Sequence, residues 1–120
     1  MGGILVKARE DLDMITINGF YAYKGDLING ESKPTFNNGA ETLTIQVDGL
    51  AGKLTLHGAV DLFSDVFYKM TGFDGSYEHI SEITADGIYS FSIEGIGKFK
   101  FEAENTNPDL KVFCRMTKGV

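Results

Sequence analysis

The chain has 120 residues, a formal net charge of −6 and 42% hydrophobic residues, so its length favours one domain with an ordinary core. Its Lys and Arg residues are scattered, which excludes the basic groove that nucleic acids require. The single cysteine, Cys114, excludes an intrachain disulfide and indicates synthesis in a reducing cytoplasm. Three consecutive apolar residues at 4–6 are too few for a signal-peptide core or a membrane span, so no membrane partner is expected.

Residues 1–40 are predicted to form an N-terminal arm, or an added strand followed by a long loop. Residues 14–23 hold enough apolar and aromatic residues for a strand, whereas 24–39 are rich in Gly, Asn and Lys, as loops are. An ordered arm must bury apolar groups to offset its loss of conformational entropy. The apolar anchors available for this are Ile4, Leu5, Val6, Ile15 and Ile17.

Turn signals and alternating runs predict strands along the chain. Six Asn-Gly and Asp-Gly dipeptides are typical of tight turns, because these residues tolerate positive φ. They lie at 18–19, 29–30, 38–39, 48–49, 74–75 and 86–87. Five runs alternate apolar and polar residues with the period of two that indicates half-buried strands. These runs are 41–47, 53–57, 88–94, 98–103 and 110–116. The short segments 48–52 and 95–97 are predicted to be hairpin loops.

The stretch 59–70 is open to two interpretations. Its apolar residues at 59, 62, 63, 66, 67 and 70 have helical spacing, with Asp61 as an N-cap. Val66, Phe67 and Tyr68 instead form a β-prone run, and we expect a strand around 65–71. Another short strand is expected within 77–84.

In chain order, these elements predict an all-β protein. Residues 41–120 are expected to form an antiparallel β-sandwich, of the jelly-roll or immunoglobulin-like kind, to which 1–40 add an N-terminal arm or extra strand. In the run at 98–103, Phe99 and Phe101 are expected in the core and Lys98 on the polar face.

No arrangement of residues indicates catalysis, so no catalytic residue, metal ligand or cofactor is predicted. His57 and His79 have no Cys or His partner at zinc spacing. Cys114 alternates with apolar residues and is expected to be a small buried hydrophobe rather than a nucleophile. Four aspartates in predicted loops match no calcium-loop spacing and are expected to shape turns. They are Asp61, Asp65, Asp74 and Asp86.

Aromatic residues in or near predicted loops are the candidate contacts. Exposed rings stack on sugars and anchor protein interfaces, so these residues are candidates for binding a partner protein or a glycan. They are Tyr21, Tyr23, Phe36, Phe73 and Tyr77. Packing on the core is the alternative, which applies to Tyr21 and Tyr23 in particular.

From residue 41 onward, six segments follow one another in a recognisable order. They are 41–49, 54–60, 66–70, 83–95 with its Gly-Ile-Tyr strand, 98–102 and 110–115. This order resembles small β-sandwich proteins of tailed-bacteriophage virions. In those proteins a strand and hairpin lead to a Gly-Ile-Tyr strand, a Gly turn, an alternating strand, a loop and a final strand. Such domains occur in capsid decoration proteins, head fibres, and tail or baseplate components.

The resemblance implies a non-enzymatic structural protein, made in the host cytoplasm and located in the virion. It would assemble with other virion proteins and with itself, because a repeated particle multiplies weak contacts through avidity. The alternative, suggested by the loop aromatics, is a carbohydrate-binding module or receptor-binding domain that recognises a surface glycan. A small hydrolase has the least support, because it needs convergent titratable groups that the sequence does not locate.

Overall fold

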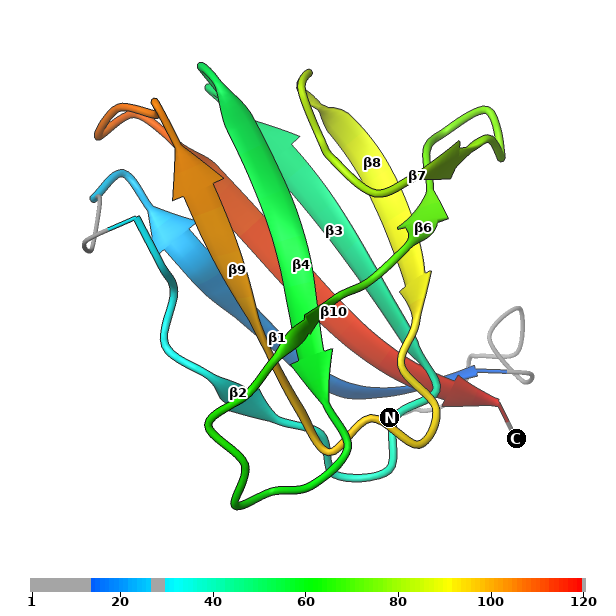
Figure 1. Ribbon diagram of the computed structural model, residues 1–120. Coiled ribbons are helices and arrows are strands. Elements are labelled where there is room, and N and C mark those ends of the chain that lie inside the picture. The colour runs from blue at the N-terminus through cyan, green and yellow to red at the C-terminus, as the bar shows by residue number, and fades with distance from the viewer. Residues whose placement is uncertain (1–13, 27–29, 120) are drawn as a thin grey trace.

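The structure, a computed structural model, describes residues 14–26 and 30–119, which form ten strands and no helix. The strands are β1 (Met14–Lys24), β2 (Thr35–Phe36), β3 (Thr42–Asp48), β4 (Lys53–Ala59), β5 (Tyr68–Lys69), β6 (Gly72–Phe73), β7 (His79–Ile80), β8 (Gly87–Ser92), β9 (Lys98–Glu104) and β10 (Lys111–Gly119). They build two antiparallel sheets packed face to face (Figure 1), so the predicted all-β sandwich is confirmed. The described part of the chain thus holds no helix long and apolar enough to cross a membrane.

The two sheets are interleaved along the chain. The six-stranded sheet has the order β1-β10-β3-β8-β6-β7, and the four-stranded sheet has the order β2-β9-β4-β5. The predicted hairpins at 48–52 and 95–97 are wrong, because each segment connects strands of opposite sheets. Alternation directs apolar side chains inward whether two strands pair side by side or face each other, so the pattern did not distinguish these arrangements.

Burial follows the predicted alternation, because successive side chains of a strand point to opposite faces. In β3, Leu43, Ile45 and Val47 are buried, whereas Gln46 and Asp48 are exposed. The inward faces of both sheets meet in one core. Its largest fully buried side chains include Tyr23, Phe91, Phe99 and Phe101.

One lysine of β9 is more buried than its face predicts. Lys98 lies on the predicted polar side of the strand, yet it is only 8% exposed. The ring of Phe67 covers it, with the ring centroid 5.2 Å from Lys98 Nζ and 4.6 Å from Lys100 Nζ. Both lysines can bury their aliphatic stems while their charges face the ring. The loop after β4 therefore folds back over the outer face of the four-stranded sheet.

β1 is an edge strand paired with β10 along its length. The turn predicted at 18–19 is wrong, because Asn18 and Gly19 pair within the strand. A register shift precedes Asn18, and a Cβ on Gly19 would lie 3.2 Å from the ring of Phe113. A bulge and a closely packed ring account for an Asn-Gly pair inside a strand.

The connection from β1 to β3 is pinned to β9. β2 pairs with β9, and Glu31 forms an isolated bridge with Glu102. Ser32 N donates to Phe101 O at 3.0 Å, and Ser32 Oγ accepts from Phe101 N at 2.9 Å. The described residues before position 41 therefore pack on the sandwich as an edge strand and a connection. Outside the described residues lie the predicted anchors at 4–6, Asn29, and the side chains of Ile15 and Ile17.

The ambiguous stretch after β4 forms turns followed by a minimal strand. The strand expected around 65–71 is confirmed only at β5, and the helical alternative is wrong. Asp61 caps a turn rather than a helix, since its Oδ1 accepts from Phe63 N at 2.9 Å. Within 77–84, the expected short strand is β7, and Ile83 adds two backbone hydrogen bonds with Leu54.

Candidate functional site

Tyr23, one of the five candidate contacts, lies in the core and is 1% exposed. Its hydroxyl lies 3.2 Å from the carbonyl oxygens of Gly30 and Phe101, which share its proton. Burial, together with the nearby Glu31 carboxylate, raises the pKa of this phenol above its ordinary value. Of the two roles left open for Tyr23, core packing is therefore the one that the structure has.

Tyr21 lies on the outer face of the six-stranded sheet and is 48% exposed. Its ring meets the ring of Phe113 edge-on at a centroid distance of 5.0 Å, and Lys24 Nζ lies 5.2 Å from its centroid. Cross-strand pairing sets one row of four side chains over β1, β10, β3 and β8. This row, here called the sheet-face patch, consists of Tyr21, Phe113, Gln46 and Ile88.

Polar groups border the sheet-face patch. A shallow depression of about 280 Å³ is lined by Tyr21, Phe113 and Gln46 together with Asp48 and Lys111. Aromatic rings beside hydrogen-bonding groups are the usual composition of a small-molecule site. The patch therefore has the chemistry needed to hold a sugar.

The other three candidates lie elsewhere. Phe73 is in β6, 39% exposed, with its ring centroid 4.6 Å from that of His79. Tyr77 is 85% exposed in the β6–β7 turn and has a φ of 63°. Phe36 is 56% exposed in β2, at an edge of the four-stranded sheet. The structure therefore does not gather the candidate aromatics into one site.

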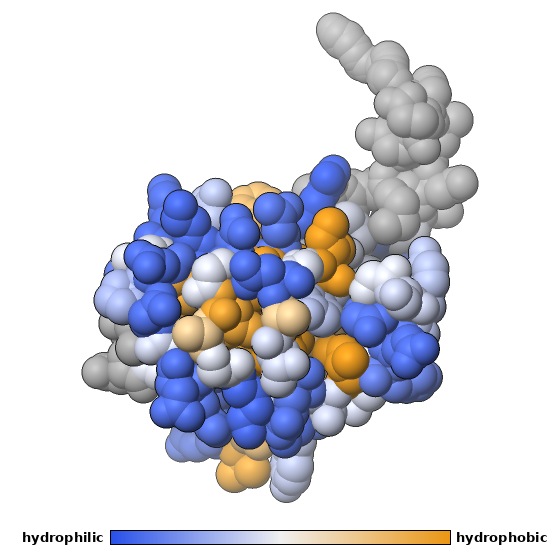
Figure 2. Space-filling view, turned by 90° about the horizontal axis from the view of Figure 1, so that it is seen from above, coloured by the Kyte–Doolittle hydropathy of each residue, from blue (hydrophilic) through white to orange (hydrophobic). Residues whose placement is uncertain are grey.

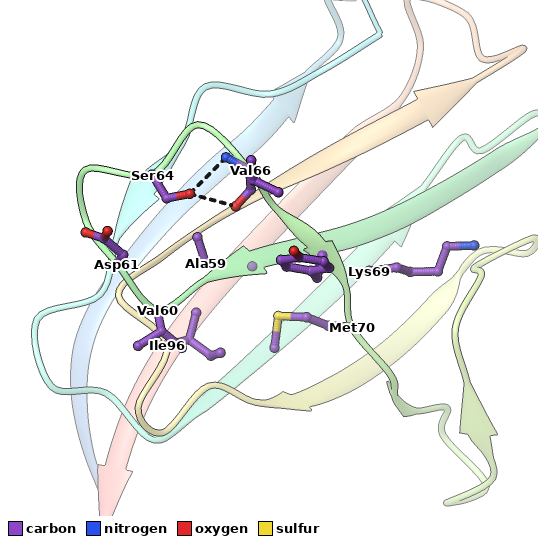
Figure 3. A pocket seen from close by; sticks show the side chains of 10 residues that line it. Ala59, Val60, Asp61, Ser64, Val66, Lys69, Met70 and Ile96 are labelled. Carbon is purple, nitrogen blue, oxygen red and sulfur yellow. Dashed lines mark hydrogen bonds between the residues drawn. The ribbon is translucent and has the colours of Figure 1, made fainter.

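A pocket of about 360 Å³ lies where β4 ends, between β5 and the β8–β9 loop (Figure 3). We call it the β4–β5 pocket. Figure 3 shows Val60, Ile96 and Met70 around its apolar centre, whereas the amino group of Lys69 points away. A Cβ on Gly58 would lie 2.5 Å from Met70 Sδ, so glycine lets Met70 pack directly against β4. The lining residues are Gly58, Ala59, Val60, Asp61, Ser64, Val66, Tyr68, Lys69, Met70 and Ile96.

The segment that borders this pocket exposes five large apolar side chains. We call these five the apolar rim: Val60 (72% exposed), Leu62 (46%), Phe63 (93%), Val66 (57%) and Tyr68 (73%). Contiguous exposed apolar surface on a small protein marks an interaction site. The β4–β5 pocket and the apolar rim together form the strongest candidate for a partner surface among the described residues.

The sequence interpretation missed the apolar rim. The available signal was the apolar run at 59–70, which was interpreted as a strand around 65–71 with a helix as the alternative. An apolar run that forms neither a helix nor an alternating strand has no face to turn inward. The five rim side chains stay outside, whereas Ala59 and Met70 at the two ends of the run contact the core.

Local hydrogen bonds fix the conformation of this loop. Ser64 N donates to Asp61 O at 3.2 Å, and Phe63 N donates to Asp61 Oδ1 at 2.9 Å. Ser64 Oγ accepts from Val66 N at 3.0 Å and lies 3.2 Å from Val66 O (dashed in Figure 3). The exposed rings are therefore held by an ordered turn rather than by a frayed segment.

The residues considered as a nucleophile or as metal ligands contact neighbours that explain their positions structurally. Cys114 is fully buried, as expected, and burial raises the pKa of its thiol to about 12, which removes the reactive thiolate. His57 Nε2 lies 2.9 Å from Thr55 Oγ1 and 3.7 Å from a Glu102 carboxylate oxygen. Within residues 14–26 and 30–119, no three His, Cys, Asp or Glu side chains are grouped to hold a metal ion.

Three of the four aspartates shape turns, as predicted. Asp61 caps the turn described above, and Asp74 accepts from Ser76 N and Glu78 N at 2.8 and 3.0 Å. Asp86 accepts from the backbone N–H groups of residues 49 and 50, so it ties the β3–β4 loop to the start of β8.

Figure 2 looks onto the end of the sandwich that carries the β3–β4 loop, where hydrophilic residues surround an apolar centre. The end of β4, next to which the β4–β5 pocket lies, is at the opposite end of the sandwich (Figure 1).

Fold and surface together define a small antiparallel β-sandwich with an exposed apolar loop. No protein-family model matches the sequence, and no curated protein matches it. The fold is similar to the crystal structure of SPBc2 prophage-derived protein YomS, with a TM-score of 0.72 and 15% identity. The similarity covers 88% of this chain and 95% of that protein, so the two share their fold over nearly their whole lengths.

Proposed function

We propose that this protein is a non-enzymatic structural protein of a bacteriophage virion, which assembles with copies of itself and with other virion subunits. The observation that carries the assembly role is the apolar rim, because Phe63 at 93% exposure suits a protein partner rather than water. The phage context is supported by the likeness to prophage-derived YomS. Capsid decoration, head-fibre and tail components are the positions that this role covers.

The contacts of the titratable groups favour a structural role over a catalytic one. Cys114 is sealed in the core, and Asp61, Asp74 and Asp86 are occupied by turn hydrogen bonds. A catalytic group must instead be accessible and held within reach of a substrate. These residues therefore support a structural role.

Particle composition tests this proposal. Virions made by the strain that carries the gene would be purified on a density gradient and their proteins quantified by mass spectrometry. We expect this protein in a fixed ratio to the major capsid protein in independent preparations. A phage replication protein serves as the control and should stay in the unassembled fraction. Finding this protein only in that fraction would overturn the proposal. Gold-labelled antibodies would then separate a head from a tail location.

The sheet-face patch favours a second candidate, recognition of a surface glycan. Tyr21 and Phe113 offer ring faces beside the polar groups of Gln46 and Lys111. A glycan array would compare the wild-type chain with Tyr21→Ala and with Phe36→Ala, which truncates a similarly exposed aromatic residue on the other sheet. Selective binding that is lost only in Tyr21→Ala would support this function, whereas no selective binding by the wild type would exclude it for the glycans on the array.

A further inference from the structure

We infer that the β4–β5 pocket and the apolar rim form a two-fold interface with a second copy of this chain, in which Phe63 of each copy enters the pocket of the other. The inference rests on the proposed function and adds to it the partner and the contact surface.

The projecting ring belongs to the same short segment of chain that lines the receiving pocket. Phe63 is 93% exposed and does not line the pocket, although Asp61 and Ser64 on either side of it do. A two-fold interface uses the same patch on both subunits, so a patch must carry both the projecting group and its receptor. A two-fold axis between Phe63 and the pocket brings each ring to the pocket of the other copy, and both contacts form together.

The pocket has the chemistry that receives a phenyl ring. Ala59, Val60 and Ile96 supply aliphatic walls, and Met70 supplies a polarizable thioether, which makes favourable contacts with aromatic rings. Met70 and Ile96 also pack against the core, so the walls are anchored. An aromatic side chain in an apolar pocket is the usual centre of a protein interface.

The apolar area available matches what a stable dimer requires. Full burial of an aromatic side chain removes about 150–250 Å², and that of an aliphatic one roughly half as much. Covering the exposed fractions of the five rim residues would therefore remove roughly 500 Å² per copy. A standard interface buries about 800 Å² per partner, of which about 60% is apolar, or roughly 480 Å². The rim alone supplies this apolar share.

Charge and order also suit a second copy. Figure 3 shows the Asp61 carboxylate and the Lys69 amino group on opposite sides of the apolar centre. Lys69 pairs with Glu82 at 3.4 Å but its side chain stays 45% exposed. Each copy therefore carries both a carboxylate and an ammonium group at the border of the apolar contact, so a second copy offers charges of the opposite sign to each. Because the turn that carries Phe63 is already hydrogen-bonded, little conformational entropy is lost on association.

The first experiment is sedimentation velocity over a concentration series of the full chain. We expect the wild type to form a reversible dimer. Phe63→Asp places a charge in the apolar contact and should weaken the dimer about 30-fold or more. Phe36→Asp is the matched control, because Phe36 is also exposed but lies in β2, and its dimer should equal that of the wild type. Melting curves of both variants check that each monomer is folded.

The second experiment locates the contact. A photoreactive benzoylphenylalanine at position 63 would be incorporated into a mixture of isotopically light and heavy chains. We expect light–heavy cross-links to Ala59, Met70 or Ile96, which only contact between two copies can produce. Cross-links between copies that map to the sheet-face patch instead would overturn the proposed contact.

The remaining outcomes show whether the proposed interface, the proposed function or both are wrong. A wild-type chain that stays monomeric at all concentrations, or a dimer unaffected by Phe63→Asp, overturns the interface. If removal of residues 1–13 dissociates such a dimer, the N-terminal segment is the contact instead. A monomeric chain that is nevertheless present in virions would refute the interface and leave the proposed function standing. A Phe63-dependent dimer that is absent from virions would do the reverse.

Discussion

In β9, Phe99 and Phe101 are at most 1% exposed, whereas in the loop after β4 and the short β5 that follows it, Phe63 and Tyr68 are 93% and 73% exposed. Both stretches are rich in large apolar residues, but β9 is paired on both sides, with β2 and β4. The loop is paired only at β5. Backbone pairing fixes which side chains face inward, so hydrophobic residues are buried in β9 and left outside in the loop. The side chains of the apolar rim therefore lie outside the core.

Truncating one ring from each region gives the largest expected contrast. Phe101→Ala should lower the free energy of unfolding by about 3–5 kcal/mol, because it removes a buried ring and leaves a cavity. Phe63→Ala should change it by less than about 0.5 kcal/mol in the monomer, because that ring is 93% exposed. Urea denaturation at a concentration below dimerisation measures both. Comparable losses in the two variants would show that the rim also stabilises the fold.

Alkaline pH should act on the buried region through Cys114. Its thiol has a pKa of about 12 in the folded protein, against an ordinary value of 9.0 in the unfolded chain. Above pH 9 the unfolded chain releases this proton while the folded chain keeps it, so the folded state binds more protons and stability falls as pH rises. The loss is about 1.4 kcal/mol per pH unit between roughly pH 9 and pH 12, and none is expected below that window.

Urea denaturation at pH 8 and pH 10.5 measures this dependence. Cys114→Ala is the control, and its stability should fall less steeply over the same interval, whatever its stability at pH 8. The phenol of Tyr23, whose pKa is also raised by burial, contributes at the upper end in both proteins. Equal slopes for the wild type and Cys114→Ala would contradict the assignment to Cys114.

The half-buried side-chain amide of Asn37 joins two connections of the sandwich, and its loss should destabilise the protein less than the loss of a core ring. Asn37 Nδ2 lies 2.9 Å from Ile93 O and 3.0 Å from Ile96 O and Ala40 O, and Asn37 Oδ1 accepts from Ala40 N at 2.8 Å. Asn37→Ala leaves these groups without their partner and should cost about 1–3 kcal/mol. Asn38→Ala, at the exposed neighbouring position, should cost far less in the same denaturation experiment. Equal costs would mean that the turn itself, and not the amide, is what matters.

The positions of the strands were predicted from the sequence more accurately than the pairing of one strand with another. A period of two identifies the buried positions of β3 and β10 from local residues alone, and these positions were correct. Whether β3 and β4 pair or face each other depends on contacts distant in sequence, and both arrangements give the same alternation. The pair Asn18-Gly19 reads as a turn because its place in an edge strand depends on the ring of Phe113.

The candidate site was harder to predict for a related reason. Tyr21 and Tyr77 were identified because they lie near loop-like composition, and both are exposed. Phe63 was not among the candidates, because it lies in the apolar run 59–70, for which a strand or a helix was considered. Exposure is a property of the whole fold, so this run alone does not show that the ring of Phe63 stays outside.

Replacing Tyr77 should give the smallest change in the free energy of unfolding. It tests directly whether an exposed aromatic ring is kept although it lowers stability. Tyr77 is 85% exposed with a φ of 63°, a left-handed conformation that costs a bulky residue about 1–2 kcal/mol. Tyr77→Gly relieves this strain and keeps the backbone hydrogen bond from residue 77 N to Asp74 O. Glycine also makes the unfolded chain more flexible, so the net gain should be about 0.5–1 kcal/mol. Ser76→Gly is the control and should be destabilising, because residue 76 has no positive φ to relieve. A stabilised Tyr77→Gly would mean that the tyrosine is kept at a cost in stability, as expected for a contact residue, whereas a destabilised one would mean that the exposed ring contributes to the fold.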